Sequence, residues 1–297
     1  MRLGRSKFIR GSAAALSLAA VALAGSLDLA MRAPAGAVAP RTQSSGGYDL
    51  VAADGGVFTF GDAAYEGSLP GLGVKVNDIR TMIASPDYRG YALGGYDGGA
   101  FSFGDFPFRG NAFQNGIPAT DIVGAAITQY GSGGLFAGAD GGVFTLAGAQ
   151  FEGSLPGLGI HVTNIVGIAA TGVNKGYWLA GSDGGIFSFG DAPFFGRVPA
   201  GPSPVVGIVA TADARGFWAV AQNGGVFAFG DAPFYGSLPG YGQRVNNIVA
   251  LVPTLDYKGY WLIGSDGGVF TLGDAQFHGS LGNLRLAQPV VAAIPTP

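Results

Sequence analysis

Acidic side chains recur along this chain, each followed by two glycines. Their carboxylate oxygens could hold a divalent cation or meet sugar hydroxyls, because hard cations prefer several oxygen ligands. Asp and Asn also cap their own turns by accepting hydrogen bonds from backbone amides. We predict this structural turn role and no metal site, since successive repeats would hold the carboxylates too far apart to share one ion. The six positions are Asp54, Asp97, Asp140, Asp183, Asn223 and Asp266.

A second acidic series lies eight residues after the first. The third repeat has Gly148 at this position instead of an aspartate. This loss indicates that each aspartate stabilises its own turn and that the series does not act together as one shared site. Its members are Asp62, Asp105, Asp191, Asp231 and Asp274.

Basic side chains occupy one equivalent position in three long links between repeats. Each stands between largely apolar neighbours, as in VKV, IHV and QRV, so strand-like alternation points it away from the core. Such cations could contact an anionic glycan or a carboxylate-bearing wall polymer, and polar side chains just downstream could bind sugar hydroxyls. The alternative is a plain solvated face. The candidate binding residues are Lys75, His161 and Arg244, with Asn77, Asp78, Asn164, Asn246 and Asn247 downstream.

Side chains suited to catalysis are few. A glycosidase needs two carboxyl groups across the scissile bond, but the two glutamates, Glu66 and Glu152, occupy one repeat position two repeats apart. The two histidines are His161 and His278, and cysteine is absent, which excludes thiol catalysis and most zinc sites. We therefore predict a non-catalytic protein without cofactors. The alternative is a carbohydrate-active hydrolase or lyase with a site in a central pocket.

The elements that position these residues repeat. The acidic anchors are 43, 43, 43, 40 and 43 residues apart, which indicates one supersecondary unit used six times. In the fourth repeat the unit reads as four strands, NIVGIAAT, GYWLAGS, GIFSFG and PFFGRV, separated by turn signals. The first two strands are apolar on both faces, as in doubly covered strands. Trp178, Trp218 and Trp261 share one place in the second strand, where we predict core residues rather than a sugar platform.

The ends of the repeat region complete each other. Residues 47–53 read as a second strand without a first, and residues 289–294 read as a first strand with nothing after it. Pairing these ends would remove the open edges that a linear array would leave. We therefore predict an all-β fold, a six-bladed β-propeller of four-stranded blades over residues 47–297, closed by its N- and C-terminal strands.

The first 39 residues differ from the rest. They join a basic head, a short apolar middle and an Ala/Pro-rich cleavage region, which predicts an export signal, with residues 40–46 as a linker. Retention as an uncleaved anchor is the alternative. Without residues 1–39 the chain keeps 11 basic and 18 acidic residues, a net charge of −7. This balance argues against a nucleic-acid partner, and we predict no membrane span in the mature chain.

The repeats resemble a known family. The segments GYW, SDGGIFSFGDAPFFG and PVVGI are similar to secreted actinobacterial repeat proteins of the GYWLVASDGGVFSFGDAPFYGS type. The resemblance covers the chain after the export segment and implies a propeller-like, extracytoplasmic module. It carries no catalytic residue over to this sequence. Together with the residues above, it predicts a secreted or cell-surface binding or scaffold module, with a cell-wall polysaccharide or a surface protein as partner.

Overall fold

Short apolar strands separated by glycine-containing turns make up almost all of the regular structure. The computed structural model describes residues 46–108, 110–111, 121–127, 133–172 and 175–297. The predicted export segment, residues 1–39, and the predicted linker up to residue 45 lie outside the described residues. The described residues belong to one compact unit.

Each repeat contributes three antiparallel strands, so that the described residues form 18 strands in six three-stranded sheets. The first strands are β3 (Ile79–Ala84), β6 (Ile122–Ile127), β9 (Ile165–Ala170), β12 (Val205–Ala210), β15 (Ile248–Pro253) and β18 (Val290–Thr296). The second strands are β1 (Gly47–Ala52), β4 (Gly90–Gly95), β7 (Gly134–Gly138), β10 (Gly176–Gly181), β13 (Gly216–Ala221) and β16 (Gly259–Gly264). The third strands are β2 (Val57–Phe60), β5 (Ala100–Gly104), β8 (Val143–Leu146), β11 (Ile186–Gly190), β14 (Val226–Gly230) and β17 (Val269–Gly273).

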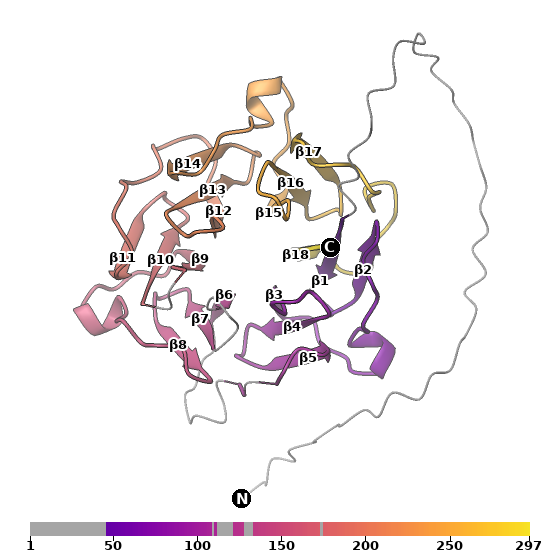
Figure 1. Ribbon diagram of the computed structural model, residues 1–297, viewed down its shortest axis with the longest axis horizontal. Helices are drawn as coiled ribbons and strands as arrows, with labels where there is room; N and C mark the ends of the chain where they lie inside the picture. The colour runs from indigo at the N-terminus through magenta and orange to yellow at the C-terminus, as the bar shows by residue number, and fades with distance from the viewer. Residues whose placement is uncertain (1–45, 109, 112–120, 128–132, 173–174) are drawn as a thin grey trace, which may run out of the picture. The chain divides into compact units, whose positions relative to one another are not determined.

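The six sheets are arranged as the blades of a propeller (Figure 1). Each first strand packs against the first strands of the blades on either side, in the cyclic order β3, β6, β9, β12, β15, β18 and back to β3. The predicted six-bladed ring is therefore confirmed. We number the blades by their second strands, so that blade 1 contains β18, β1 and β2.

The ring closes through the two ends of the repeat region. β18 pairs antiparallel with β1, and β1 pairs with β2 on its other side. Thr296 lies opposite Gly47, and Ile294 lies opposite Asp49. The predicted closure by terminal strands is confirmed, and the pairing extends two residues beyond the predicted end at Ile294.

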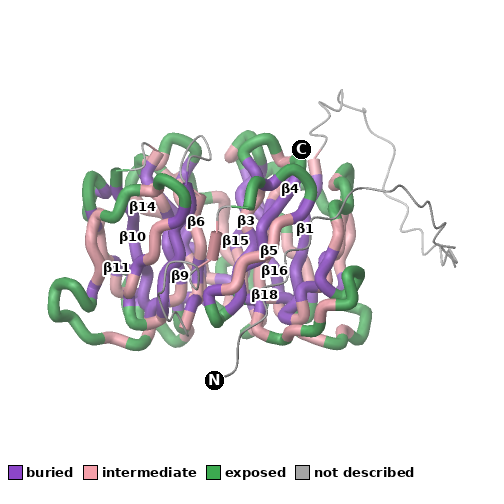
Figure 2. The backbone as a smooth tube through the Cα atoms, turned by 90° about the horizontal axis from the view of Figure 1, so that it is seen from below, coloured by how far each residue is buried: buried purple, intermediate pink, exposed green. Residues whose placement is uncertain are grey.

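The core lies between the blades. The second strand is buried along its whole length in all six blades, while the turns at both ends of the blades are exposed (Figure 2). A hydrophobic cluster fills each of the six interfaces between described blades. Among the described residues, the cluster between blades 2 and 3 has the fewest buried members, Ile122, Phe136 and Leu146.

The predicted fourth strand is wrong. Residues 193–198, the PFFGRV segment, form no strand, and the described parts of the equivalent segments form none either. Pro193 lacks a backbone N–H for a ladder hydrogen bond. Three residues later, Gly196 has a φ of 108°, and the equivalent glycines also have positive φ, which an extended strand does not allow. The blades are therefore three-stranded, with an irregular fourth segment along the outer edge.

Tyrosine side chains hold this fourth segment, which lacks the backbone hydrogen bonds of a paired strand. The hydroxyl of a second-strand tyrosine donates across the blade interface to the carbonyl of the positive-φ glycine in the preceding repeat. We call this contact the tyrosine clasp. Its four pairs are Tyr48 with Gly279, Tyr91 with Gly67, Tyr177 with Gly153 and Tyr260 with Gly236.

Candidate functional site

The Asp-Gly-Gly turns connect the second and third strands at one face of the ring, which we call the Asp-Gly-Gly face. In every blade the anchor side chain accepts a hydrogen bond from the backbone N–H of the second glycine. The donor–acceptor distance is 2.9 Å for Asp54 and 3.0 Å for Asp183. Each anchor therefore stabilises its own turn. The remaining pairs are Asp97 with Gly99, Asp140 with Gly142, Asn223 with Gly225 and Asp266 with Gly268.

The long links run along the same face. Leu69 N–H donates to the carbonyl of Gly55 in the turn, at 3.1 Å, and Ile79 N–H donates to the carbonyl of Ala53, also at 3.1 Å. Between these two contacts the chain forms a short 3-10 helix, η1 (Pro70–Leu72). Its counterparts are η4 (Pro156–Leu158) and η5 (Pro239–Tyr241), and the three project from the outer edge of the ring (Figure 1).

The predicted cationic residues follow these helices. Lys75, His161 and Arg244 are exposed, while the apolar residues next to them, such as Val74 and Val76, pack against a blade interface. Each helix ends at a glycine with left-handed φ, such as Gly73 at 71°, which turns the chain back toward the ring. The structure thus presents one basic side chain on each of three alternate blades, all on the Asp-Gly-Gly face.

The polar residues downstream divide into two groups. Asn77 and Asn246 are exposed, whereas Asp78, Asn164 and Asn247 are half-buried at the start of the first strand. The carbonyls of the half-buried residues accept hydrogen bonds from the turns, for example from Tyr96 N–H to Asp78 at 2.8 Å. Their side chains lie close to the backbone of the same turns. The three cations are not gathered with them into one pocket, because they belong to separate blades.

The second acidic series lies at the opposite face of the ring. The carboxylates of Asp191 and Asp231 accept hydrogen bonds from the hydroxyls of Thr171 and Thr211, at 2.8 and 3.0 Å. Each of these threonines follows directly after the last residue of the first strand in the same blade. Among the described residues, no group of three or more His, Cys, Asp or Glu side chains is placed to hold a metal ion.

The three tryptophans are buried, with at most 4% of each side chain exposed. The indole N–H of Trp178 donates to the carbonyl of Pro193 at 2.8 Å, and Trp218 and Trp261 make the same contact with Pro233 and Gln276. These residues pack in the core and fix the turn after the third strand. They do not form a sugar platform.

Sequence reasoning missed the residue that each of these turns presents. In the three repeats with a tryptophan, the residue after the acceptor carbonyl is aromatic. The equivalent residue is aromatic in the other three repeats too, and all six side chains are 52–66% exposed. We call this set the aromatic rim: Tyr65, Phe108, Phe151, Phe194, Phe234 and Phe277. The signal was available, because the rim residues recur eleven positions after the anchors, but the segment was assigned to a strand.

Two buried polar side chains depart from the repeat pattern. Asp49 occupies the position of the tryptophans, is 2% exposed, and has no hydrogen-bond partner at Oδ1. Burial, followed by the nearby Glu66 carboxylate, raises the pKa of Asp49 to about 7. Thr296, on the paired strand, also has an unpartnered hydroxyl. Both atoms lie in the closing blade.

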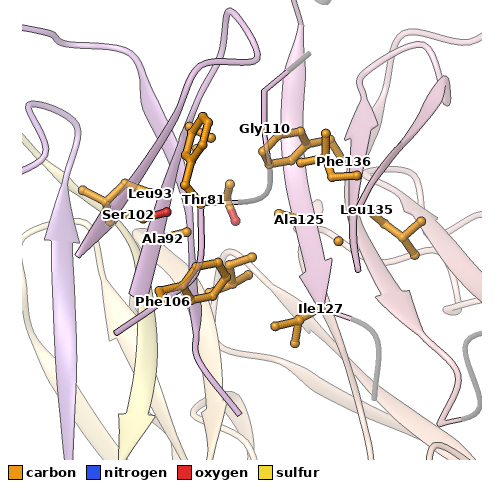
Figure 3. Close-up of a pocket in the computed structure, with 16 residues that line it drawn as sticks. Thr81, Ala92, Leu93, Ser102, Phe106, Gly110, Ala125, Ile127, Leu135 and Phe136 are labelled. Atoms are coloured by element: carbon orange, nitrogen blue, oxygen red, sulfur yellow. The ribbon is translucent and has the colours of Figure 1, made fainter. Parts of the chain in front are cut away.

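One apolar cavity lies between blades 2 and 3, with a volume of about 30 Å³ (Figure 3). It adjoins Gly134 and Gly110, which occupy the two positions of the tyrosine clasp. Phe106 also lines it, at a position where blade 4 has Ala192. The cavity is therefore the space of a missing tyrosine ring, partly refilled by Phe106.

Comparisons with known proteins are limited to the fold. No protein-family model and no curated protein matches the chain. Among solved structures, the β-propeller domain of Cps50 (Swd1) from Myceliophteria thermophila is similar, with 13% sequence identity and a TM-score of 0.46. The match covers 73% of this chain and 71% of that chain. The propeller architecture described above rests on the strand pairing of this chain itself.

Among the described residues, no helix has the length and apolar character needed to cross a membrane.

Proposed function

We propose that this chain is a non-catalytic, exported propeller that binds a cell-wall polysaccharide through its Asp-Gly-Gly face. The observation that carries the proposal is the placement of Lys75, His161 and Arg244, which are exposed on one face at equivalent positions of three blades. Lys75 and Arg244 can pair with repeated anionic groups of a polymer and His161 can donate a hydrogen bond to them, and several weak contacts combine into a higher overall affinity. The predicted export signal and the family resemblance support a location at the cell surface.

The polar side chains of the links support the same proposal. Asn77 and Asn246 are exposed two residues after Lys75 and Arg244, so these two cations are each accompanied by an amide that can bind sugar hydroxyls. The anchor aspartates contribute less, since each is engaged by its own turn.

The test is co-sedimentation of the full chain with purified sacculi that retain their anionic wall polymers. We expect the Lys75→Ala/His161→Ala/Arg244→Ala variant to lose most binding, and the binding of the parent to weaken with added salt. The matched control is Lys175→Ala/Arg215→Ala/Lys258→Ala, which removes three exposed cations from the opposite face. Equal loss in both variants would reject the site in favour of a general charge effect.

The same incubation separates binding from catalysis. A binding module leaves the polymer at its original length, whereas a hydrolase or lyase releases soluble fragments. Release of fragments by the parent chain would overturn the non-catalytic part of the proposal.

A further inference from the structure

The aromatic rim is more uniform among the repeats than two buried positions of the second strand are. The buried tryptophan position holds Asp49, Ala92 and Leu135 in the first three repeats, and the clasp tyrosine is replaced by Gly134 and Phe217 in two repeats. In contrast, the exposed rim position is Tyr or Phe in all six repeats. Hydrophobic stabilisation comes from area removed from water. A ring that stays mostly exposed gains little from it, so folding alone does not explain this uniformity.

The rim side chains stand on rigid turns. In blades 4, 5 and 6 a buried tryptophan holds the carbonyl directly before the rim residue, at 2.7–2.8 Å. In blades 4 and 5 the aspartate three residues earlier is fixed by a threonine hydroxyl. A ligand that contacts the rim therefore meets groups whose conformation is already set, which reduces the entropy lost on binding.

The surroundings of the rim are polar and acidic. In five repeats an exposed aspartate precedes the rim residue by three positions on the same turn, as Asp191 precedes Phe194. Protein interfaces usually have a continuous apolar centre with few charges, and the rim instead separates its rings by polar turns. Anionic lipid surfaces attract basic rather than acidic segments. A flat apolar ring next to a hydrogen-bond acceptor matches a sugar unit, which offers a C–H face and hydroxyl donors.

At three blades the rim continues onto the helix tips. Tyr65 donates a hydrogen bond to Ser68 Oγ at 2.8 Å, and Ser68 accepts another from Gly71 N–H in η1. The residues at the ends of the three helices, Leu72, Leu158 and Tyr241, are 61–67% exposed. In blade 1 the rim ring therefore reaches the helix, and the other two odd-numbered blades each carry a rim ring and an exposed helix end in the same segment of the chain.

We propose that the aromatic rim is a second carbohydrate-binding surface, which stacks against uncharged sugar units of a polysaccharide. The inference rests on the proposed function, because it assigns a further contact for the same class of polymer. The Asp-Gly-Gly face recognises anionic groups, while the acidic rim favours neutral stretches. Repetition around the ring lets one polymer contact several blades, which raises the overall affinity.

The test uses three probes with the full chain: intact sacculi, sacculi stripped of anionic wall polymers, and amorphous chitin. We expect the Phe194→Ala/Phe234→Ala/Phe277→Ala variant to bind the stripped sacculi at least tenfold more weakly than the parent, with an unchanged melting temperature. The Phe194→Tyr/Phe234→Tyr/Phe277→Tyr variant should retain binding, because Tyr65 already occupies a rim position. The control Leu255→Ala/Leu284→Ala, which removes exposed apolar side chains outside the rim, should remain within twofold of the parent.

The outcomes separate the two proposals. Equal binding by the parent and the rim alanine variant would overturn the rim site, and an equal loss in the leucine control would show non-specific adsorption instead. Binding of the parent to intact but not to stripped sacculi, with loss in the Lys75/His161/Arg244 variant, would overturn the rim site and leave the proposed function standing. Binding to chitin as well as stripped sacculi would support recognition of neutral sugar units. No binding to any of the three probes would overturn both.

Discussion

At the scale of single residues, Asp49 makes stability depend on pH. Its pKa is raised from 3.8 to about 7, so the folded state holds the proton more tightly than the unfolded state does. The stability that protonated Asp49 contributes is complete below about pH 4 and is lost as the pH rises to about 7. A shift of this size corresponds to at most about 4 kcal/mol.

We expect Asp49→Asn to be more stable than the parent at pH 8 and close to it at pH 4. Urea unfolding followed by tryptophan fluorescence between pH 4 and 8 measures the difference. Thr296→Val is the control, because it removes the other unpartnered buried polar group without a titrating proton. Its effect should be the same at every pH. A difference between Asp49→Asn and the parent that stays constant with pH would contradict the assignment.

The tyrosine clasp gives a second prediction at this scale. Phe217 occupies the clasp position of blade 5, where it is buried but has no hydroxyl for the carbonyl of Gly196. We expect Phe217→Tyr to raise the free energy of unfolding by about 1 kcal/mol, the usual net contribution of one hydrogen bond. We expect Tyr260→Phe to lower it by about 1–3 kcal/mol, because the partly buried carbonyl of Gly236 loses its donor. Thermal denaturation at neutral pH measures both, because burial raises the pKa of Tyr260 to about 12 and keeps its hydroxyl a donor. A loss of stability in Phe217→Tyr would show that Gly196 is not placed to accept.

At the scale of elements, the interface between blades 2 and 3 differs from the others in its described residues. It has the smallest core cluster, the only missing aromatic ring at the clasp position among the described blades, and the apolar cavity. A Cβ added at Gly134 would meet no atom closer than 3.8 Å, so alanine fits there. Beyond that Cβ position, the side chain of Phe106 fills part of the space between the blades.

We expect Phe106→Ala to cost about 3–5 kcal/mol, the usual range for a buried phenylalanine. Gly134→Tyr alone should destabilise by about 1–3 kcal/mol, because its ring would overlap Phe106. The double variant should lie close to the parent, since it restores the ring and clasp of the other interfaces. Chemical denaturation of the four proteins gives the coupling energy.

Gly134→Ala is the control for the backbone at this site, and we expect it to be neutral or stabilising by about 0.5 kcal/mol. Additive effects of Phe106→Ala and Gly134→Tyr would mean that the two side chains do not share one space.

At the scale of the whole molecule, the closing blade joins strands from the two ends of the repeat region. The pairing of Gly47 with Thr296 brings these ends together. We expect a circular permutant that links residue 297 to residue 46 by a short glycine linker, and opens between Asp213 and Ala214, to fold with the same far-ultraviolet circular dichroism. The new opening lies in an exposed loop between β12 and β13.

We expect deletion of residues 290–297 to have the opposite effect. It removes β18, leaves β1 with an unpaired edge, and opens the interfaces on both sides of blade 1, so cooperative unfolding should be lost. Adding a synthetic peptide of residues 289–297 should raise the melting temperature of the truncated chain in a concentration-dependent way. An unchanged melting transition in the truncated chain would show that β18 does not close the ring.

Much of the architecture follows from the sequence alone. The fixed interval between the Asp-Gly-Gly anchors determines six equal units, and the incomplete strands at the two ends of the repeat region determine the closure. Alternation within the links also places Lys75, His161 and Arg244 on the surface. These features are local or periodic, so they can be read without knowing which residues meet in space.

The tertiary structure decided the rest, because contacts between blades join residues far apart in the chain. The fourth segment has strand-like residues, but glycines with positive φ and clasps from the neighbouring blade keep it irregular. The aromatic rim is exposed, and Asp49 is buried with no hydrogen-bond partner at Oδ1, although hydropathy alone suggests an exposed aspartate and buried rings. Burial depends on which surfaces the neighbouring blades cover, and only the closed ring determines that.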